Sequence, residues 1–352
     1  MQVHAHHAPD GNGEHRFFLF GVPQAVCDNL AIMSDERPRY ISIHITDRCN
    51  ARCRHCHIWK IEPLPQLSLY DYFNLVDQLG EWLGKCDVIV AGGEPLLSDY
   101  TLPLIERCGQ NRLFTVLATN GFLLDADMAA KLKSAHLGMA NISLDGFDHT
   151  HDRIRRTPGG FSKVMSAIEN LNQAGIPCSI NCTIMEDNLD QITGLVDFLM
   201  RNHKIDGFFF QAIAKTLGER NLTESWYGDS PHFPKDPNKV AALLDELLAM
   251  KHSTFPFHNT DNQFAAMKAY FANPSRFSLA TCTVGDRGFS ISATGFIHFC
   301  ADLPPVARIT EGHIRNLLAS KNARDLRKRM HRCRDNCHML INCSFDPDQL
   351  IS

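Results

Sequence analysis

The sequence lacks the features of a membrane or nucleic-acid-binding protein. No apolar run approaches the ~18 residues that a membrane-spanning helix needs. Charge of one sign is not in excess either, because 35 Lys and Arg stand against 39 Asp and Glu, which leaves a formal net charge of −4. That balance provides no general attraction to nucleic acid or to an anionic membrane. The polar, His-rich start also lacks a secretory signal pattern. These absences predict a cytoplasmic protein that binds neither membrane nor nucleic acid.

What the chain does contain is enough apolar material for a large folded core. Hydrophobic residues make up 44% and charged residues 21% of its 352 residues, a composition typical of globular proteins. This length favours one large α/β domain with an appended module. Residues 1–39 are predicted to form a largely disordered leader, in which His4, His6 and His7 could bind a metal weakly.

Strand and helix patterns alternate six times between about residues 40 and 213. This rhythm predicts right-handed βαβ units and a parallel sheet covered by helices, although periodicity does not distinguish an open sheet from a partial barrel. In such sheets, ligands bind at the carboxyl ends of the strands, where Gly-containing turns fall here. The predicted strands cover residues 40–46, 86–95, 113–121, 139–146, 176–184 and 205–213.

The 13 cysteines are unevenly distributed along the chain. Without an export signal they are expected to stay reduced, so clustered cysteines indicate metal binding rather than disulfides. The first cluster, Cys49, Cys53 and Cys56, directly follows a predicted strand. Three thiolates can hold three corners of a [4Fe–4S] cube and leave the fourth iron open to a small molecule. The scattered cysteines are expected in the core; they are Cys27, Cys86, Cys108, Cys178 and Cys182.

These features resemble the radical S-adenosylmethionine (SAM) superfamily. The CxxxCxxC spacing of residues 49–56 is its signature, and four further segments are similar to its motifs in order: GGEP (92–95), TNG (119–121), SLDG (143–146) and HDRIRRTPGGF (151–161). The resemblance covers roughly residues 40–213 and implies a partial (β/α)6 barrel. It also implies that a [4Fe–4S] cluster binds SAM, cleaves it reductively and yields a 5′-deoxyadenosyl radical that abstracts hydrogen from a substrate. A reducing electron donor such as flavodoxin or ferredoxin would then be a partner.

The resemblance also implies roles for individual residues. Cys49, Cys53 and Cys56 would ligate the cluster. Gly92, Gly93 and Glu94 would contact the SAM ammonium, and Arg155 would contact the SAM carboxylate. Ser143 and Asp145 would contact the ribose or amino-acid part, and Asn120 within TNG is a further cofactor-binding residue. His55 would lie beside the adenine, where the family more often has Tyr or Phe. The alternatives are a capping hydroxyl for Ser143 and a solvated ion pair for Asp145 and Arg155. No catalytic residue is identified.

The second cysteine group extends over residues 282–343. Residues 288–299 predict a β-hairpin with Gly295 at its turn, and a helix is predicted over about 316–330. The pattern resembles the twitch and SPASM extensions of radical SAM enzymes, which implies that residues 276–352 form a small α+β module with one auxiliary [4Fe–4S] cluster. Four of five cysteines would ligate it, with the choice between Cys333 and Cys343 left open; the five are Cys282, Cys300, Cys333, Cys337 and Cys343. The alternative is a structural zinc site, in which His298, His331 or His338 could replace a thiolate.

Two further segments carry predictions. Residues 214–275 are predicted to form a linker or lid loop followed by helical structure, because residues 214–236 are rich in turn-forming residues. Residues 321–334 contain seven Lys or Arg and one acid, Asp325. Three roles are open for this segment: a solvated helix face, a binding site for a substrate phosphate, or a docking surface for an acidic electron donor.

The predicted function is therefore hydrogen abstraction from a small molecule such as a sugar, sugar nucleotide or aminocyclitol. Oxidation, dehydration, epimerisation and decarboxylation all remain open, and Cys178 or Cys182 could return a hydrogen atom in an epimerase. Only about 39 residues precede the first predicted strand, too few for a folded peptide-recognition domain. A peptide or protein maturase is nevertheless an alternative. An alternative of another class is a non-catalytic zinc or iron–sulfur module with a regulatory role.

Overall fold

The computed structural model describes most of the central part of the chain. The described residues are 37–62, 64, 66–215, 226–253, 255–275 and 282–333, together with the backbone of a short antiparallel pair, β1 (Phe17–Leu19) and β2 (Val22–Gln24). Several predictions lie outside these residues, namely those for His4, His6, His7, Cys27, His338, Cys337 and Cys343. No helix of the described residues is both long and apolar enough to cross a membrane.

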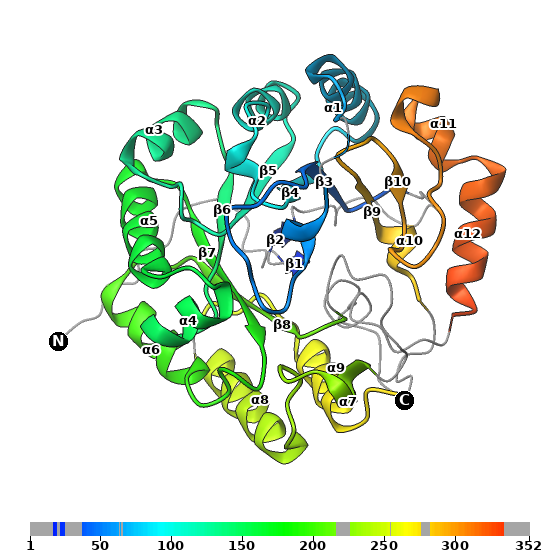
Figure 1. Ribbon diagram of the computed structural model, residues 1–352. Helices are drawn as coiled ribbons and strands as arrows, with labels where there is room; N and C mark the ends of the chain where they lie inside the picture. The colour runs from blue at the N-terminus through cyan, green and yellow to red at the C-terminus, as the bar shows by residue number, and fades with distance from the viewer. Residues whose placement is uncertain are drawn as a thin grey trace.

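Eight strands form one sheet in the order β10-β9-β3-β4-β5-β6-β7-β8. The six predicted strands are confirmed as a parallel run within it: β3 (Tyr40–Thr46), β4 (Asp87–Gly92), β5 (Phe114–Thr119), β6 (Met139–Ser143), β7 (Cys178–Ile184) and β8 (Gly207–Ala212). The strands curve into an incomplete ring (Figure 1). In the described part of the chain, β8 and β10 are the two edges of the sheet and do not pair with each other. The predicted partial barrel is therefore confirmed.

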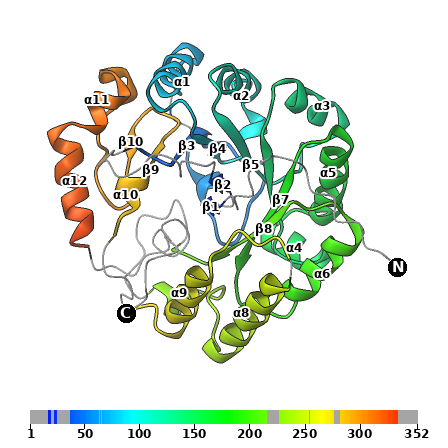
Figure 2. The ribbon, with the colours of Figure 1, turned by 180° about the vertical axis from the view of Figure 1, so that it is seen from behind.

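Helices surround the ring of strands in both views (Figures 1 and 2). Ser68 begins the first helix as predicted, because its hydroxyl accepts from the Asp71 amide while the Asp71 carboxylate accepts from the Ser68 amide. Each helix buries one apolar stripe against the outer face of the sheet. The six are α1 (Leu69–Leu83), α2 (Thr101–Gln110), α3 (Ala126–Ser134), α4 (Asp148–Arg155), α5 (Gly160–Ala174) and α6 (Ile192–Asn202).

Helical structure follows β8, as predicted for residues 214–275. The elements are α7 (Trp226–Asp229), α8 (Pro237–His252) and α9 (Asp261–Ala272). Between α8 and α9 the chain returns to the edge of the barrel, where the Phe208 amide donates to the Pro256 carbonyl at 2.9 Å and the His258 amide donates to the Phe208 carbonyl at 2.9 Å. This segment therefore covers part of the edge that β8 would otherwise expose.

The hairpin of residues 288–298 is confirmed, with Gly295 in its turn at a φ of +88°. Its strands are β9 (Gly288–Ile291) and β10 (Ile297–His298), and β9 pairs in parallel with β3, so the hairpin extends the barrel sheet. Beside it lie α10 (Val284–Arg287), α11 (Ile314–Leu318) and α12 (Lys321–His331). The single helix predicted over 316–330 is wrong, because Ser320 caps a new helix by accepting from the Ala323 amide at 3.2 Å.

Candidate active site

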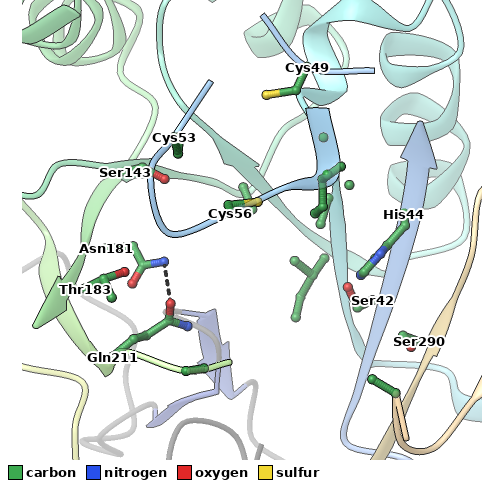
Figure 3. Close-up of a pocket in the computed structure, with 18 of the residues that line it drawn as sticks. Ser42, His44, Cys49, Cys53, Cys56, Ser143, Asn181, Thr183, Gln211 and Ser290 are labelled. Carbon is green, nitrogen blue, oxygen red and sulfur yellow. Dashed lines mark hydrogen bonds between the residues drawn. The ribbon is translucent and has the colours of Figure 1, made fainter. Parts of the chain in front are cut away.

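A cavity of about 600 Å³ opens at the carboxyl ends of the barrel strands. It is lined by most of the predicted site residues, namely Cys49, Cys53, Cys56, His55, Gly92, Gly93, Asn120, Ser143, Arg155 and Cys300. Figure 3 shows the three cysteines of the first group together with polar residues from the strands that line this cavity. Its apolar floor includes Tyr40 and Ile89, which belong to a small core cluster inside the barrel. The fold thus brings separate motifs to one place, as their positions after successive strands predict.

The cysteine loop is fastened to the turn after β4. The Gly93 amide donates to the Thr46 carbonyl at 2.7 Å, and the Glu94 amide donates to the Arg48 carbonyl at 2.7 Å. A Cβ on Gly93 would collide with the Arg48 carbonyl oxygen. Glycine is therefore needed here because the cysteine loop approaches the turn so closely. The resemblance assigns these glycines to the SAM ammonium, and that contact stays a prediction.

Glu94 is fully buried and acts inside the protein as a connector. Its carboxylate accepts from the Thr119 hydroxyl at 2.7 Å, the Asn120 amide at 2.8 Å and the Leu96 amide at 3.1 Å. Burial raises the pKa of Glu94, although these hydrogen bonds oppose the shift. Asn120 continues the connection, because its side-chain amide donates to Asn50 in the cysteine loop at 2.7 Å. The GGEP and TNG motifs thus fix the loop that carries the cysteines.

Arg155 and Asp145 form a buried ion pair beneath the cysteines, not the solvated pair considered as an alternative. The Arg155 Nε donates to Asp145 Oδ2 at 2.7 Å, and Arg155 Nη1 donates to the Cys53 sulfur at 3.7 Å. Burial would raise the pKa of Asp145, but the charge and hydrogen bond of Arg155, together with His55 and His151, outweigh burial and leave that pKa below its usual value. Arg155 also lines the cavity, whereas Asp145 accepts from the Thr183 amide at 3.1 Å.

His55 presents a neutral imidazole to the cavity. Burial, reinforced by the nearby charge of Arg155, lowers the pKa of His55 to about 4. Its Nδ1 atom is buried and has no hydrogen-bond partner among the described residues. An unpartnered ring nitrogen in a ligand-sized cavity is what a hydrogen-bonding ligand would satisfy.

The cavity has two polar walls, and apart from Ser143 and His298 the sequence analysis did not identify their residues. Figure 3 shows one wall from β3 and β9 and the opposite wall from β6, β7 and β8. The first contains Ser42, His44, Ser290 and His298, and the second contains Ser143, Asn181, Thr183 and Gln211. The signal was present in the strands, because polar residues occupy alternate positions of YISIHIT and CSINCTI, whereas a strand buried on both faces reads as apolar throughout.

Strand register explains how the first wall forms. Ser42 on β3 is opposite Ser290 on β9, and Ser290 is opposite His298 on β10. His44 is two residues beyond Ser42, so its side chain lies on the same face of the sheet as that of Ser42. Burial lowers the pKa of His44, so its imidazole is neutral, and the opposing charge of Asp47 does not reverse the shift. On the second wall, the Asn181 side chain donates to Gln211 at 3.2 Å while its own Oδ1 lacks a partner among the described residues.

The second cysteine group comes together from three elements. Cys282 precedes α10, Cys300 follows β10 and Cys333 follows α12. Burial raises the pKa of the Cys282 thiol to about 11, and Cys300 and Cys333 contribute to the same shift. Cys300 lines the main cavity as well. His298 lines the cavity, and His331 is paired with Asp286 at 2.6 Å.

The first cysteine group fits an iron–sulfur cube better than a single metal ion. Among the described residues, no three His, Cys, Asp or Glu side chains converge so as to hold one ion. A zinc site requires such convergence, whereas the thiolates of a [4Fe–4S] cube bind different irons. All three donors are sulfur, which is the ligand that iron–sulfur clusters require. The unpartnered atoms of His55 and Asn181 in the same cavity fit a polar ligand such as SAM.

Cys178 and Cys182 do not reach this cavity. Both are buried in β7, with exposed fractions of 0% and 2%, and neither lines the cavity wall. Burial raises the pKa of both thiols, which keeps them protonated. They are core residues, so a role in returning hydrogen to a substrate is not supported.

Comparison with known proteins agrees with this geometry. The family model of the radical SAM superfamily matches residues 43–199. An AdoMet-dependent heme synthase of Methanosarcina barkeri is 34% identical over 159 residues, which are 44% of this chain and 45% of that protein. An AdoMet-dependent heme synthase of Oleidesulfovibrio alaskensis is 27% identical over 315 residues, 86% of this chain and 80% of that protein. The chain thus matches less than half of the first relative's length and most of the second's.

A solved structure shows the same fold. The Streptococcus suis protein SuiB bound to S-adenosylmethionine superposes with a TM-score of 0.65 at 16% identity, over 87% of this chain and 72% of that chain. At this identity the likeness concerns the fold alone. It extends over more of the chain than the family model does, and so it includes elements after residue 199.

Proposed function

Because residues 43–199 match the family model of the radical SAM superfamily, we propose that this chain is a radical SAM enzyme, which binds a [4Fe–4S] cluster through Cys49, Cys53 and Cys56 and cleaves SAM reductively in the cavity. The observation that carries this proposal is the convergence of three thiols, a buried cation and unpartnered polar atoms on one cavity. When bound, the cluster and SAM would supply hydrogen-atom abstraction, a reaction that amino-acid side chains cannot perform. The chain's own residues bind, orient and shield these groups.

Arg155 supports this proposal through its two contacts. Its guanidinium stays positively charged because Asp145 and the Cys53 sulfur outweigh the effect of burial on its pKa. One side of the guanidinium pairs with Asp145, and Nη1 donates to the sulfur of Cys53. A cation in this place would offset the negative charge of a cysteine sulfur bound to iron. Its cavity-facing side would also hold the carboxylate of SAM.

His55 and the polar second wall would position the rest of SAM. The neutral His55 ring can stack on the adenine while its Nδ1 atom forms a hydrogen bond. Asn181 offers an unpartnered oxygen, and Ser143 offers a hydroxyl, to ribose hydroxyls. These contacts would hold SAM inside the cavity, away from water.

The substrate is proposed to be a small neutral molecule that carries hydroxyl groups, such as a sugar or an aminocyclitol. Pockets for one drug-sized ligand span ~300–1,000 Å³, and this cavity of about 600 Å³ must hold SAM as well. The first wall offers neutral groups, namely Ser42, His44, Ser290 and His298. In the described lining, the Lys and Arg side chains are Lys215 and Arg155, and Arg155 is already paired. These features suit an uncharged substrate.

A second candidate, an iron porphyrin, is favoured by the names of the relatives. Both are AdoMet-dependent heme synthases, and one of them matches 86% of this chain. A porphyrin with carboxylate side chains would call for several cations and for more space than the cavity offers beside SAM. The two candidate substrates therefore differ in charge and in size, and a binding experiment can distinguish them.

The second cysteine group is proposed to hold one auxiliary [4Fe–4S] cluster. Cys282, Cys300 and Cys333 would be three ligands, and one of Cys337 and Cys343, which lie outside the described residues, would be the fourth. Cys300 lines the same cavity as Cys53, so an auxiliary cluster would lie close to the substrate. An electron removed from a substrate radical would then have a nearby acceptor.

The experiment is a substrate screen with the reconstituted protein under anaerobic conditions. SAM, dithionite and one probe at a time would be added: monosaccharides, sugar nucleotides, aminocyclitols, a peptide mixture, or haem as the porphyrin probe. We expect a hydroxylated small molecule to increase 5′-deoxyadenosine formation and to change mass itself. Tight haem binding with a shifted Soret band, and no response to the sugars, would overturn the first candidate in favour of the second. A mass change confined to the peptides would overturn both.

A further inference from the structure

A group of positively charged side chains surrounds the cysteine loop on the outside of the protein. We call it the basic rim; it consists of Arg52, Arg54, Lys60, Arg153 and Arg156. Arg52, Lys60 and Arg156 are exposed, and the side chains of Arg54 and Arg153 are 33% and 44% exposed. The whole chain has a net charge of −4, so this concentration of positive charge does not follow from the composition.

The rim is one continuous surface because two segments are joined by hydrogen bonds. The Arg54 amide donates to the Ile154 carbonyl at 2.9 Å, and the Arg52 amide donates to the Arg155 carbonyl at 3.3 Å. These bonds hold the cysteine loop against the end of α4. The charged side chains of both segments therefore face solvent in the same region.

Shared partners connect the rim further. Arg52 and Lys60 both approach the indole ring of Trp59, at 5.8 and 5.4 Å from its centroid. Arg54 and Arg153 both approach the Asp187 carboxylate, at 3.8 and 3.6 Å. Asp187 is also bonded to His232 at 2.5 Å. It offsets part of the charge of Arg54 and Arg153, while Arg52, Lys60 and Arg156 make no ion pair with it.

The rim lies directly over the proposed cluster ligands. Cys53 is between Arg52 and Arg54 in the loop, and it is buried beneath them with an exposed fraction of 6%. Trp59, whose ring Arg52 and Lys60 approach, donates from Nε1 to the Cys56 carbonyl at 2.8 Å and also lines the cavity. Because Arg52 and Arg54 are the chain neighbours of Cys53, a protein bound to them would lie close to a proposed cluster ligand. Electron transfer weakens steeply with distance, so this is a short route for an electron from outside.

We propose that the basic rim is the docking surface for a small acidic electron-carrier protein of the flavodoxin or ferredoxin type. This inference rests on the proposed function, because the electron would be delivered to the cluster held by Cys53. Complementary charge steers such encounters and makes their rate dependent on salt. Electron-transfer complexes are small and weak, so a rim of five cations around one loop is a sufficient footprint.

The exposed face of α12 provides a matched control. Lys321, Lys328 and Arg329 are exposed on this helix, which precedes Cys333 of the second cysteine group. In the described part of the chain, no residue of α12 lines the cavity. The two surfaces are thus similar in charge and differ in their distance from the first cysteine group. A carrier that responds to positive charge alone would use both equally.

The test uses the reconstituted full-length enzyme with reduced flavodoxin as the probe. One variant reverses the rim (Arg52→Glu, Lys60→Glu, Arg153→Glu), one neutralises it with Gln at the same positions, and the control reverses α12 (Lys321→Glu, Lys328→Glu, Arg329→Glu). Flavodoxin binding at low salt and the rate of 5′-deoxyadenosine formation would be measured, the latter with flavodoxin or with dithionite as reductant.

We expect the reversed rim to lower the flavodoxin-driven rate by about tenfold or more, within the ~10–10³-fold range of electrostatic steering, with an intermediate loss for the Gln variant. The dithionite-driven rate should stay unchanged, which also shows that the variants fold. Equal flavodoxin-driven rates for rim variant and wild type, or an equal loss in the α12 variant, would refute the docking surface. Failure of the wild type with dithionite would instead refute the proposed function, and flavodoxin binding would then judge the rim independently.

Discussion

The two cysteine groups are built in different ways. The first consists of three cysteines on one loop of eight residues, held by the turn after β4 and by the end of α4. The second collects Cys282, Cys300 and Cys333 from three elements that lie 18 to 51 residues apart in the chain (300 − 282 and 333 − 282). Local spacing therefore determines the first group, whereas the second exists only when the hairpin and α12 have packed on the barrel.

The surroundings of the sulfurs differ as well. Cys53 accepts from the positively charged Arg155, while Cys300 accepts from the neutral backbone amide of Asp302 at 3.4 Å. A nearby cation favours the thiolate and tunes a bound cluster electrostatically, which a single amide does more weakly. This difference indicates that the first group is suited to a charged cofactor, whereas the second group is a more isolated site near the cavity.

The largest contrast is expected between two glycine substitutions. In Gly93→Ala the new Cβ would collide with the backbone of Arg48 and displace the cysteine loop. In Gly295→Ala it would meet the flexible Leu67 side chain at 2.7 Å in a left-handed conformation, which costs about 1–2 kcal/mol. We expect Gly93→Ala to lose the first cluster and Gly295→Ala to retain it with lower stability. Iron content and thermal unfolding measure both effects, and equal iron loss would contradict the contrast.

The next effect concerns the buried ion pair of Arg155 and Asp145 beside the first group. Arg155→Gln leaves Asp145 buried without its cation, and breaking a buried pair typically costs about 3–5 kcal/mol. The same change removes the donor to Cys53, so SAM cleavage should fall together with stability. Chemical unfolding and 5′-deoxyadenosine formation would show it. In contrast, Arg327→Gln near the second group should leave the rate of SAM cleavage within twofold of the wild-type rate. An equal loss in both variants would show that Arg155 is not specifically required.

A smaller effect is the pH dependence of that ion pair. The pKa of Asp145 is lower in the folded protein than in the unfolded chain. Its contribution to stability is therefore present above its unfolded pKa, ~3.9, and is lost as the pH falls toward the folded value. The difference in unfolding free energy between wild type and Asp145→Asn should shrink on acidification through this window. A difference that stays constant from pH 6 to pH 3 would contradict a lowered pKa of Asp145 in the folded protein.

The smallest effect is expected at His55. A Phe side chain keeps the ring but removes the unpartnered Nδ1, and one hydrogen bond is worth about 0.5–1.5 kcal/mol, or roughly 2–10-fold in affinity. His55→Phe should therefore weaken SAM binding within that range, and His55→Ala should weaken it further. Calorimetric titration of SAM into the reconstituted protein measures both. Unchanged affinity in both variants would place the adenine elsewhere.

Most of the barrel was predictable from the sequence because its signals are local. Apolar strands, the Ser68 cap and the CxxxCxxC spacing each depend on neighbouring residues. The pairing of β9 with β3 was not predictable, because it joins residues about 250 positions apart by backbone hydrogen bonds that any sequence can form. The internal role of Glu94 was missed for a similar reason. Its three donors come from two turns, and only the folded chain brings Thr119 and Asn120 to it.

The measurement that tests the account most directly is the iron content and SAM cleavage of two triple variants. Reconstituted wild type should hold about eight irons, as two [4Fe–4S] clusters require. Replacing Cys49, Cys53 and Cys56 by Ala should leave about four irons and abolish 5′-deoxyadenosine formation, whereas replacing Cys282, Cys300 and Cys333 should leave about four irons and retain it. A first-group variant that still cleaves SAM, or that loses no iron, would contradict the central claim.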